Sequence, residues 1–178
     1  MKNLWAPWRM TYVGGISEGK ECFLCKALAA DDKDDCLVLW RSELTFCIIN
    51  RFPYNNGHLL VAPNRHVGDV EALTEAEMCA LMHDTVRAQK LLNRVMKPHG
   101  FNWGLNVGRA AGAGLIDHLH MHVVPRWEGD TNFMPVFADV KVIPQALEDL
   151  CSMLKHEAEE EGRRSRRSRN SRKSRKRR

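Results

Sequence analysis

The stretch that most constrains the fold is residues 117–126, which read D-H-L-H-M-H-V-V-P-R. His118, His120 and His122 alternate there with apolar residues, and a period of two is typical of a β-strand with one buried face. The pattern predicts a strand over 118–124 that carries three imidazole rings on the face opposite the core. The solvent-exposed face of an ordinary strand more often carries Thr, Lys or Glu. Three histidines there therefore indicate a site that uses imidazole nitrogens.

Other short apolar runs predict four further strands, at residues 37–40, 46–50, 58–62 and 103–107. The first two flank three polar residues, which predicts a hairpin. The third run is stopped by Pro63, which cannot donate to a sheet ladder. Two helices complete the order strand, strand, strand, helix, strand, strand, helix. That order predicts an α+β domain built on an antiparallel sheet of about five strands.

The first predicted helix begins at a capping box, in which Thr74 is followed three residues later by Glu77. An apolar stripe of about 3.6-residue period predicts its core face, and the stripe consists of Met78, Leu81, Met82, Leu92 and Val95. The second helix opens at Pro144 and carries Leu147, Leu150 and Leu154 on one side. Its acidic end, residues 157–161, lies where the helix dipole disfavours negative charge, so fraying is expected there.

Charge divides the chain into two parts. The formal net charge is +5, yet residues 162–178 hold 11 of the 27 Lys and Arg residues and no acid, so residues 1–161 carry a net charge of −6. The basic segment has no apolar residue and is expected to be disordered. It is either a solvated polycation without a dedicated role or a sequence-independent attractor of RNA, DNA or anionic surfaces. Residues 1–161 then form one domain with an aromatic-anchored N-terminal arm.

Neither a run of about 18 apolar residues nor an N-terminal signal pattern occurs, so no membrane span and a cytoplasmic location are expected. Six cysteines in 178 residues are too few for a disulfide framework. Cys22 and Cys25 are close in sequence, and as a pair they are compatible with zinc, redox chemistry or accident. The other four are expected to be small buried hydrophobes, namely Cys36, Cys47, Cys79 and Cys151.

Residues 118–126 resemble the signature of the histidine-triad (HIT) nucleotide-binding family, His-φ-His-φ-His-φ-φ. Residues 4–10 and 127–134 are similar to the branch of diadenosine polyphosphate phosphorylases and hydrolases. The likeness covers about residues 4–136. It implies a HIT-like fold, a homodimer joined sheet edge to sheet edge, and a nucleotidyl hydrolase or transferase that cleaves adenine dinucleotide polyphosphates.

The resemblance also assigns catalytic roles to histidines. The middle one, His120, would attack phosphorus and form a transient nucleotidyl-histidine, while its second nitrogen is held as N–H. His122 would contact the phosphate or the leaving oxygen. His118 completes the triad, and His58 matches the family's fourth histidine, although a lone histidine at a strand edge is more often structural.

Nucleotide-binding residues follow from the same resemblance. Asn50 matches a ribose-binding position, but it can also form an Asx turn before Pro53. Asn106 lies upstream of the triad with a glycine-rich segment, whose backbone N–H groups could approach a phosphate. That segment comprises Gly112, Ala113, Gly114, Leu115 and Ile116. Most glycine-rich loops are only turns; this one gains weight because its last glycine lies four residues before His118.

The family's hydrolases usually carry Gln followed by Ser or Thr before the triad, whereas residues 113–116 here are Ala-Gly-Leu-Ile. Backbone donors must then hold the leaving phosphate, which favours inorganic phosphate over water as the acceptor. Two other functions stay open: hydrolysis of a nucleoside phosphoramidate, and a non-catalytic nucleotide-binding or RNA-associated regulator.

Many HIT relatives join such a cysteine pair to two histidines. The matching positions are His66, after the third strand, and His118. With Cys22 and Cys25 they would form a closed tetrahedral zinc site that is structural rather than catalytic.

Overall fold

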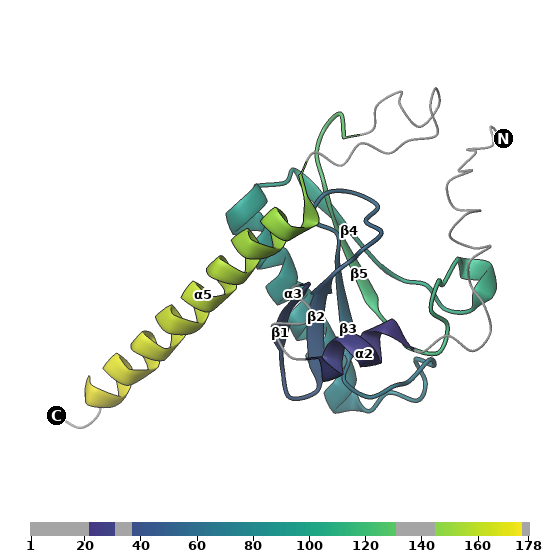
Figure 1. The fold of residues 1–178 in the computed structure, drawn as a ribbon. Helices are drawn as coiled ribbons and strands as arrows, with labels where there is room; N and C mark the ends of the chain where they lie inside the picture. The colour runs from purple at the N-terminus through teal and green to yellow at the C-terminus, as the bar shows by residue number, and fades with distance from the viewer. Residues whose placement is uncertain (1–21, 31–36, 131–144, 176–178) are drawn as a thin grey trace.

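The computed structural model describes residues 22–30, 37–130 and 145–175, and it shows one five-stranded antiparallel sheet (Figure 1). The strand order is β1-β2-β3-β5-β4. The strands are β1 (Val38–Arg41), β2 (Thr45–Ile49), β3 (Leu59–Pro63), β4 (Gly100–Leu105) and β5 (Met121–Arg126). The α+β class, the five strands and the β1–β2 hairpin are confirmed. The N-terminal arm and Cys36 lie outside the described residues.

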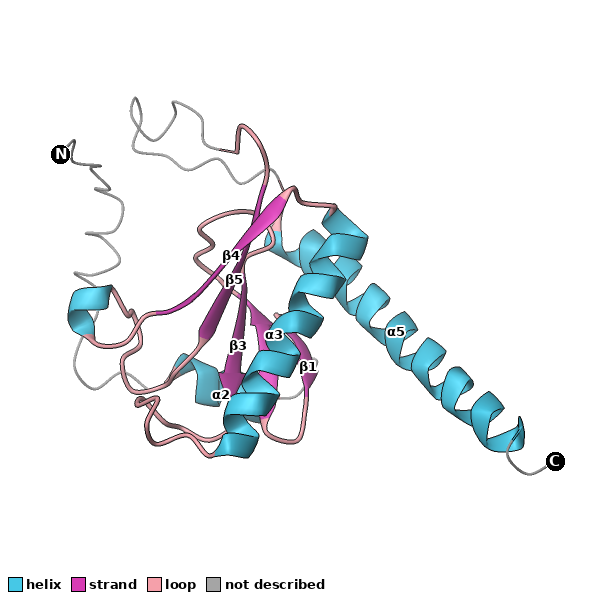
Figure 2. Ribbon diagram, turned by 180° about the vertical axis from the view of Figure 1, so that it is seen from behind, coloured by secondary structure: helices cyan, strands magenta, loops and turns pink. Residues whose placement is uncertain are grey.

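The helices are α2 (Phe23–Ala29), α3 (Glu75–Met96) and α5 (Leu147–Arg175), with a short 3₁₀ helix η1 (Arg109–Ala111) between β4 and β5. The capping box of Thr74 and Glu77 is present at the start of α3. Figure 2 shows α3 lying across one face of the sheet, where it packs against β2, β3 and β5. α5 packs against α3 and β1. No sequence pattern predicted α2, which is only seven residues long.

The buried face of α3 differs from the predicted apolar stripe. Met78 and Met82 are 44% and 47% exposed, so their assignment to the core was wrong. The buried positions instead include the polar residues Asp84 and Thr85. Polar groups are accepted in a core when they are hydrogen-bonded. Asp84 Oδ2 meets that condition three times, accepting from Trp40 Nε1 at 3.1 Å, Ser42 Oγ at 2.7 Å and Thr45 Oγ1 at 2.6 Å.

Strand β5 begins at Met121, three residues later than predicted. Its pairing with β3 ends at the Val61–Met121 pair. Two residues further along β3 comes Pro63, which has no N–H to donate, so the ladder stops. The preceding segment is held by a different bond, from Leu119 N–H to the carbonyl of Val67 at 2.7 Å. His118 and His120 therefore lie on an ordered approach to the strand rather than within it.

Helix α5 continues to Arg175, where fraying from residue 157 and disorder from residue 162 were expected. The acidic end of its first half is compensated by ion pairs, because Arg94 contacts Glu157 at 3.0 Å and Glu161 at 3.2 Å. Arg and Lys are also good helix formers. The division of the chain at residue 161 stays a prediction.

Two further expectations concern exposure and membranes. Cys47 and Cys151 are buried as predicted, but Cys79 is exposed on α3, so its prediction was wrong. Among the described residues, no helix is both long and apolar enough to cross a membrane.

Candidate active site and metal centre

The histidines gather on the sheet face that α3 leaves open. Met121 and Val123 pack into the core beneath α3, and neighbouring residues of a strand point to opposite faces. His122 therefore lies on the far face, where its ring is in edge contact with that of His120 at 4.9 Å between centroids. Both side chains are buried, at 8% and 7% exposure. The two later members of the triad are thus buried side by side.

The tautomer of His120 follows from one contact. Its Nδ1 lies 2.8 Å from the carbonyl oxygen of His118, and a carbonyl can only accept, so Nδ1 carries the hydrogen. Nε2 then presents a lone pair. Burial lowers the pKa of His120 below its ordinary value, and the bond to the carbonyl opposes this shift only in part. The ring is therefore neutral near pH 7, the form that can attack an electrophilic phosphorus.

His58 fixes the tautomer of His122 across the β3–β5 pair. The backbone N–H of Tyr54 donates to His58 Nδ1 at 3.0 Å, so the hydrogen of the neutral His58 ring is on Nε2. That nitrogen lies 2.9 Å from Nδ1 of His122 and donates to it. His122 consequently carries its own hydrogen on Nε2. His58 is fully buried and is part of this relay rather than an isolated edge histidine.

The turn before β3 holds His58 in place. Gly57 has φ +79°, and a Cβ there would come within 2.7 Å of Met96 Sδ, so only glycine fits without adjustment. Tyr54 contributes its ring as well as its N–H. The ring stacks on His122 at 5.5 Å between centroids and contacts His58 at 4.7 Å. Sequence reasoning missed Tyr54, because a backbone donor leaves no signal in residue type.

Asn50 forms the Asx turn that its sequence context predicted, and it also contacts His58. Its Oδ1 accepts from Phe52 N–H at 3.0 Å, which forms the expected Asx turn, and its Nδ2 lies 3.2 Å from His58 Nδ1. Asn106 lies on the other side, with its amide 3.4 Å from His122 Nε2. Since that nitrogen carries hydrogen, the amide oxygen of Asn106 must face it, which needs a half-turn of the amide group. Ribose binding by Asn50 stays a prediction.

The glycine-rich segment is partly packed into the protein. Ala113 is buried and Leu115 packs against the core, while Gly112, Gly114 and Ile116 are half-buried. Gly112 adopts φ +80°, and its N–H donates to the carbonyl of Arg109, so this amide is already used. Arg109 itself is an exposed cation in the same loop. Phosphate binding by this segment stays a prediction.

Four metal-ligating side chains meet at one end of the sheet: Cys22, Cys25, His66 and His118. Their ligand atoms all lie within 4.8 Å of one another. Cys22 caps α2 and Cys25 lies in its first turn, so the helix start places both thiols together. Cys22 Sγ is 3.3 Å from His118 Nδ1, and Cys25 Sγ is 3.2 Å from His66 Nδ1.

The chemistry of this donor set suits a metal. Nε2 of His118 lies 2.8 Å from the carbonyl of Pro63 and must donate to it, which leaves the Nδ1 lone pair facing the thiols. Burial and the neighbouring Cys22 raise the pKa of the Cys25 thiol to about 11. Two adjacent thiolates therefore need a cation. Two sulfurs and two imidazole nitrogens are a ligand set of structural zinc.

His118 joins the two sites. Neither of its ring nitrogens contacts His120 or His122, since one lies at the cysteines and one at Pro63. Its carbonyl oxygen is the group that holds His120. Any contribution of His118 to catalysis would therefore act through its backbone.

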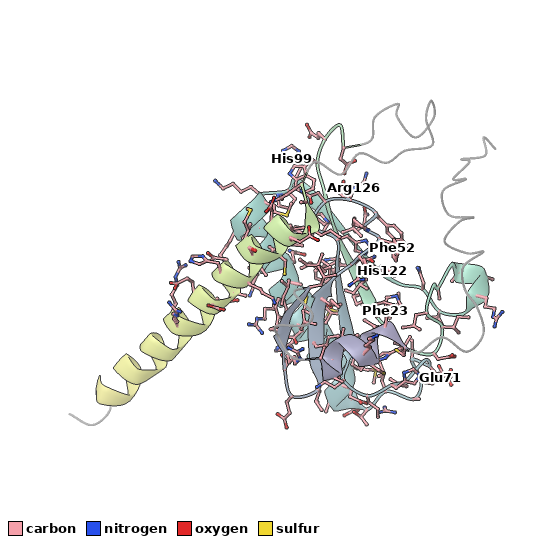
Figure 3. The ribbon with its side chains drawn as sticks, viewed as in Figure 1. Phe23, Phe52, Glu71, His99, His122 and Arg126 are labelled. Carbon is pink, nitrogen blue, oxygen red and sulfur yellow. The ribbon has the colours of Figure 1, made fainter. Side chains whose placement is uncertain are left out.

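Figure 3 labels His122, Phe52 and Phe23 along one side of the ribbon, and the two phenylalanines are 66% and 46% exposed.

A model of the HIT domain matches residues 32–129, which is more than half of the chain. The chain belongs to the HIT family. It is 40% identical over 164 residues to the AP-4-A phosphorylase of Mycobacterium tuberculosis, which covers 88% of this chain and 84% of that protein. It is therefore an AP-4-A phosphorylase-like HIT nucleotidyl enzyme. The Schizosaccharomyces pombe bis(5'-nucleosyl)-tetraphosphatase [asymmetrical] is 31% identical over 93 residues, covering 52% of this chain and 50% of that one.

Solved HIT structures have the same fold. A Zn-bound histidine triad family protein from Mycobacterium smegmatis superposes with a TM-score of 0.62 at 21% identity, covering 79% of this chain and 94% of that one. A histidine triad nucleotide-binding protein from Sulfolobus tokodaii gives 0.63 at 24% identity, with coverage of 78% and 93%. At these identities the likeness concerns the fold.

Proposed function

We propose that this HIT protein cleaves adenine dinucleotide polyphosphates and transfers the nucleotidyl group to inorganic phosphate through His120. The observation that carries the proposal is the tautomer of His120, which directs a neutral Nε2 lone pair away from the carbonyl of His118. The likeness to AP-4-A phosphorylase over 88% of the chain supports both the substrate class and phosphate as the acceptor.

The reaction proceeds in two displacements. In the first, His120 Nε2 forms a bond to phosphorus while the bond from phosphorus to the leaving polyphosphate oxygen breaks. The N–H of His122 donates to the oxygen on which negative charge develops. The ring of His120 becomes cationic, and its Nδ1–H stays on the carbonyl of His118. In the second displacement a phosphate oxygen attacks phosphorus, and the N–P bond electrons return to Nε2.

The acceptor decides the products and can be measured directly. With phosphate as the acceptor, diadenosine tetraphosphate yields ATP and ADP; with water it yields ATP and AMP. Chromatography of reactions from zero to millimolar phosphate should show ADP rising with phosphate, and isotopically labelled phosphate should appear in the ADP. AMP as the sole partner of ATP at every phosphate concentration would make the protein a hydrolase. No cleavage at all would overturn the enzymatic assignment.

Zinc and dimerisation complete the proposal. Cys22, Cys25, His66 and His118 would hold one structural zinc ion, and no step of the reaction passes through it. Strand β4 is at an edge of the sheet, and its Trp103 is 39% exposed, which supports antiparallel pairing with β4 of a second copy. Light scattering should give twice the chain mass; a monomer at micromolar concentration would refute this pairing. A cytoplasmic location is also proposed, and the likeness to AP-4-A phosphorylase supports it.

A further inference from the structure

The C-terminal half of α5 differs in chemistry from the rest of the protein. Residues 163–175 contain eight Arg and Lys residues, four serines and one asparagine, with no acidic, apolar or aromatic side chain. They are helical, so they span about 20 Å at 1.5 Å per residue. Figure 1 shows this end of α5 extending away from the sheet. The segment is thus a cationic rod apart from the histidine site.

The rod lacks internal counter-charges. The carboxylates of α5 stop at Glu161, which pairs with Arg87 and Arg94. The first two arginines of the segment reach α5 carboxylates, Arg163 at Glu160 and Arg164 at Glu157. From residue 162 onward the sequence has no acid. Like charges three and four residues apart repel on a helix, so this segment loses stability wherever no external anion neutralises it. A polyanion bound along the rod would remove that repulsion.

The composition of residues 163–175 indicates which kind of polyanion they can bind. An amphipathic membrane anchor needs an apolar face, and residues 163–175 have none. Stacking on single-stranded bases needs aromatic side chains, which are also missing from this segment. A nucleic-acid duplex presents one phosphate about every 1.7 Å of its axis, which can engage many cations of one helix at once. Residues 1–161, with a net charge of −6, would repel such a polymer.

We infer that residues 163–175 are a sequence-independent binding site for the phosphate backbone of double-stranded polynucleotides. The site is separate from the histidines, and it goes beyond the cleavage of dinucleotides. Because the cations supply nearly all of the attraction, affinity depends steeply on salt. Each phosphate contact contributes about 0.9 to the slope of log K against log salt concentration for duplex DNA.

The test measures binding of the full chain to 20-base-pair DNA and RNA duplexes of unrelated sequences. Fluorescence anisotropy gives the affinity at several salt concentrations. The full chain should bind all of them, and residues 1–162 alone should not. Replacing Arg166, Arg167, Arg169 and Arg172 by Gln preserves helix-forming residues while removing four charges. This variant should lower the salt slope by up to about 3.6 and weaken binding about 10- to 100-fold at moderate salt.

The matched control keeps the charge and changes the hydroxyls. Replacing Ser165, Ser168, Ser171 and Ser174 by Ala should leave affinity and salt slope unchanged. Helicity measured by circular dichroism should rise when duplex is added to the full chain. All variants should retain dinucleotide cleavage, which separates this inference from the proposed function.

Several outcomes would overturn the inference. If the full chain and residues 1–162 bind duplex with equal affinity, residues 163–175 are not the binding element. A large loss in the serine variant would contradict a purely cationic site. Binding to phosphatidylglycerol vesicles as tight as binding to duplex, at the same salt concentration, would assign the rod to membranes instead.

Discussion

His118 illustrates how one residue can connect structure and chemistry. Its Nδ1 faces Cys22 and Cys25, its Nε2 donates to Pro63, and its carbonyl fixes the tautomer of His120. We therefore expect a change in the proposed metal ligands to affect the proposed nucleophile through the backbone oxygen of His118. The rings of His118 and His120 differ in direction although the residues are two positions apart, because both precede strand β5.

Substitution of His120 by Ala should abolish turnover while nucleotide binding persists. The nucleophilic nitrogen is lost, but Asn50 and the glycine-rich loop are untouched, so turnover should fall at least about 10³-fold with little change in Kd. Single-turnover kinetics and calorimetric nucleotide titration measure the two effects. His156, which is exposed on α5, provides the control as His156→Ala. If His120→Ala keeps more than about a tenth of wild-type turnover, the covalent role is wrong.

The relay through His58 predicts a second effect. His58→Leu removes the donor to His122 Nδ1, so His122 can carry its hydrogen on either nitrogen, and kcat should fall about 10- to 100-fold. His58→Gln should recover part of the activity, because its amide can both accept and donate. Nitrogen-15 chemical shifts should show His122 as the Nε2–H tautomer in the wild type and as a mixture in the Leu variant. An unchanged tautomer in the Leu variant would refute the relay.

At the scale of elements, α3 shows which features are local and which are not. Its start was predictable from Thr74 and Glu77, because a capping box involves neighbours within one turn. Its buried face was not predictable from apolar spacing. Asp84 takes a buried position because residues of the β1–β2 hairpin and its turn, 39 to 44 positions away, supply its three donors.

The Glu77 carboxylate should make the stability of α3 depend on acid. Its hydrogen bonds to Arg65 and Thr74 lower its pKa from 4.5 to about 2. A carboxyl group whose pKa is lower in the folded than in the unfolded state stabilises the fold at pH values above its unfolded pKa. This stabilisation is lost as the pH falls through the folded-state pKa. Glu77→Gln should therefore lower Tm at pH 7, and the difference should shrink between pH 4.5 and 2.

Thermal unfolding monitored by circular dichroism across that pH range is the measurement. Glu75→Gln is the matched control, since Glu75 is exposed in the same first turn. A Tm difference for Glu77→Gln that is constant from pH 7 to pH 2 would show that the carboxylate charge is not the cause.

At the scale of the whole molecule, the cysteine–histidine cluster connects parts of the chain that are far apart in sequence. Cys25 and His66 are 41 positions apart, and Cys22 and His118 are 96 apart. A metal ion at this cluster would fasten α2 to the residues after β3 and before β5. Such a link stabilises the folded state, because the unfolded chain does not present the four ligands together.

Purified protein should contain close to one zinc ion per chain, and Cys22→Ser should lower both the zinc content and Tm, by about 5–10 °C. Cys79→Ser is the control, because Cys79 is exposed and outside the cluster. Elemental analysis and calorimetry measure both quantities. A metal-free wild-type protein whose Tm equals that of Cys22→Ser would refute the zinc proposal.

The sequence alone determined the features that depend on neighbouring residues. Alternating histidines indicated β5 but not its start at Met121, Thr74 and Glu77 marked a helix start, and the charge division separated residues 162–178 from the rest. These patterns are readable because backbone geometry places residues two, three or four positions apart at known relative directions.

Only the tertiary structure decided which of these groups meet and in what protonation form. His58 reaches His122 through the pairing of β3 with β5, and His66 reaches Cys25 across the end of the sheet. The tautomers depend on a carbonyl and a backbone N–H, which no residue type reveals. The course of α5 beyond residue 162 was likewise missed, because composition predicts how a segment packs but not whether a stable helix preceding it continues. The contacts from His58 to His122 and from Cys25 to His66 join atoms 64 and 41 positions apart, and local sequence patterns carry no information on such distances.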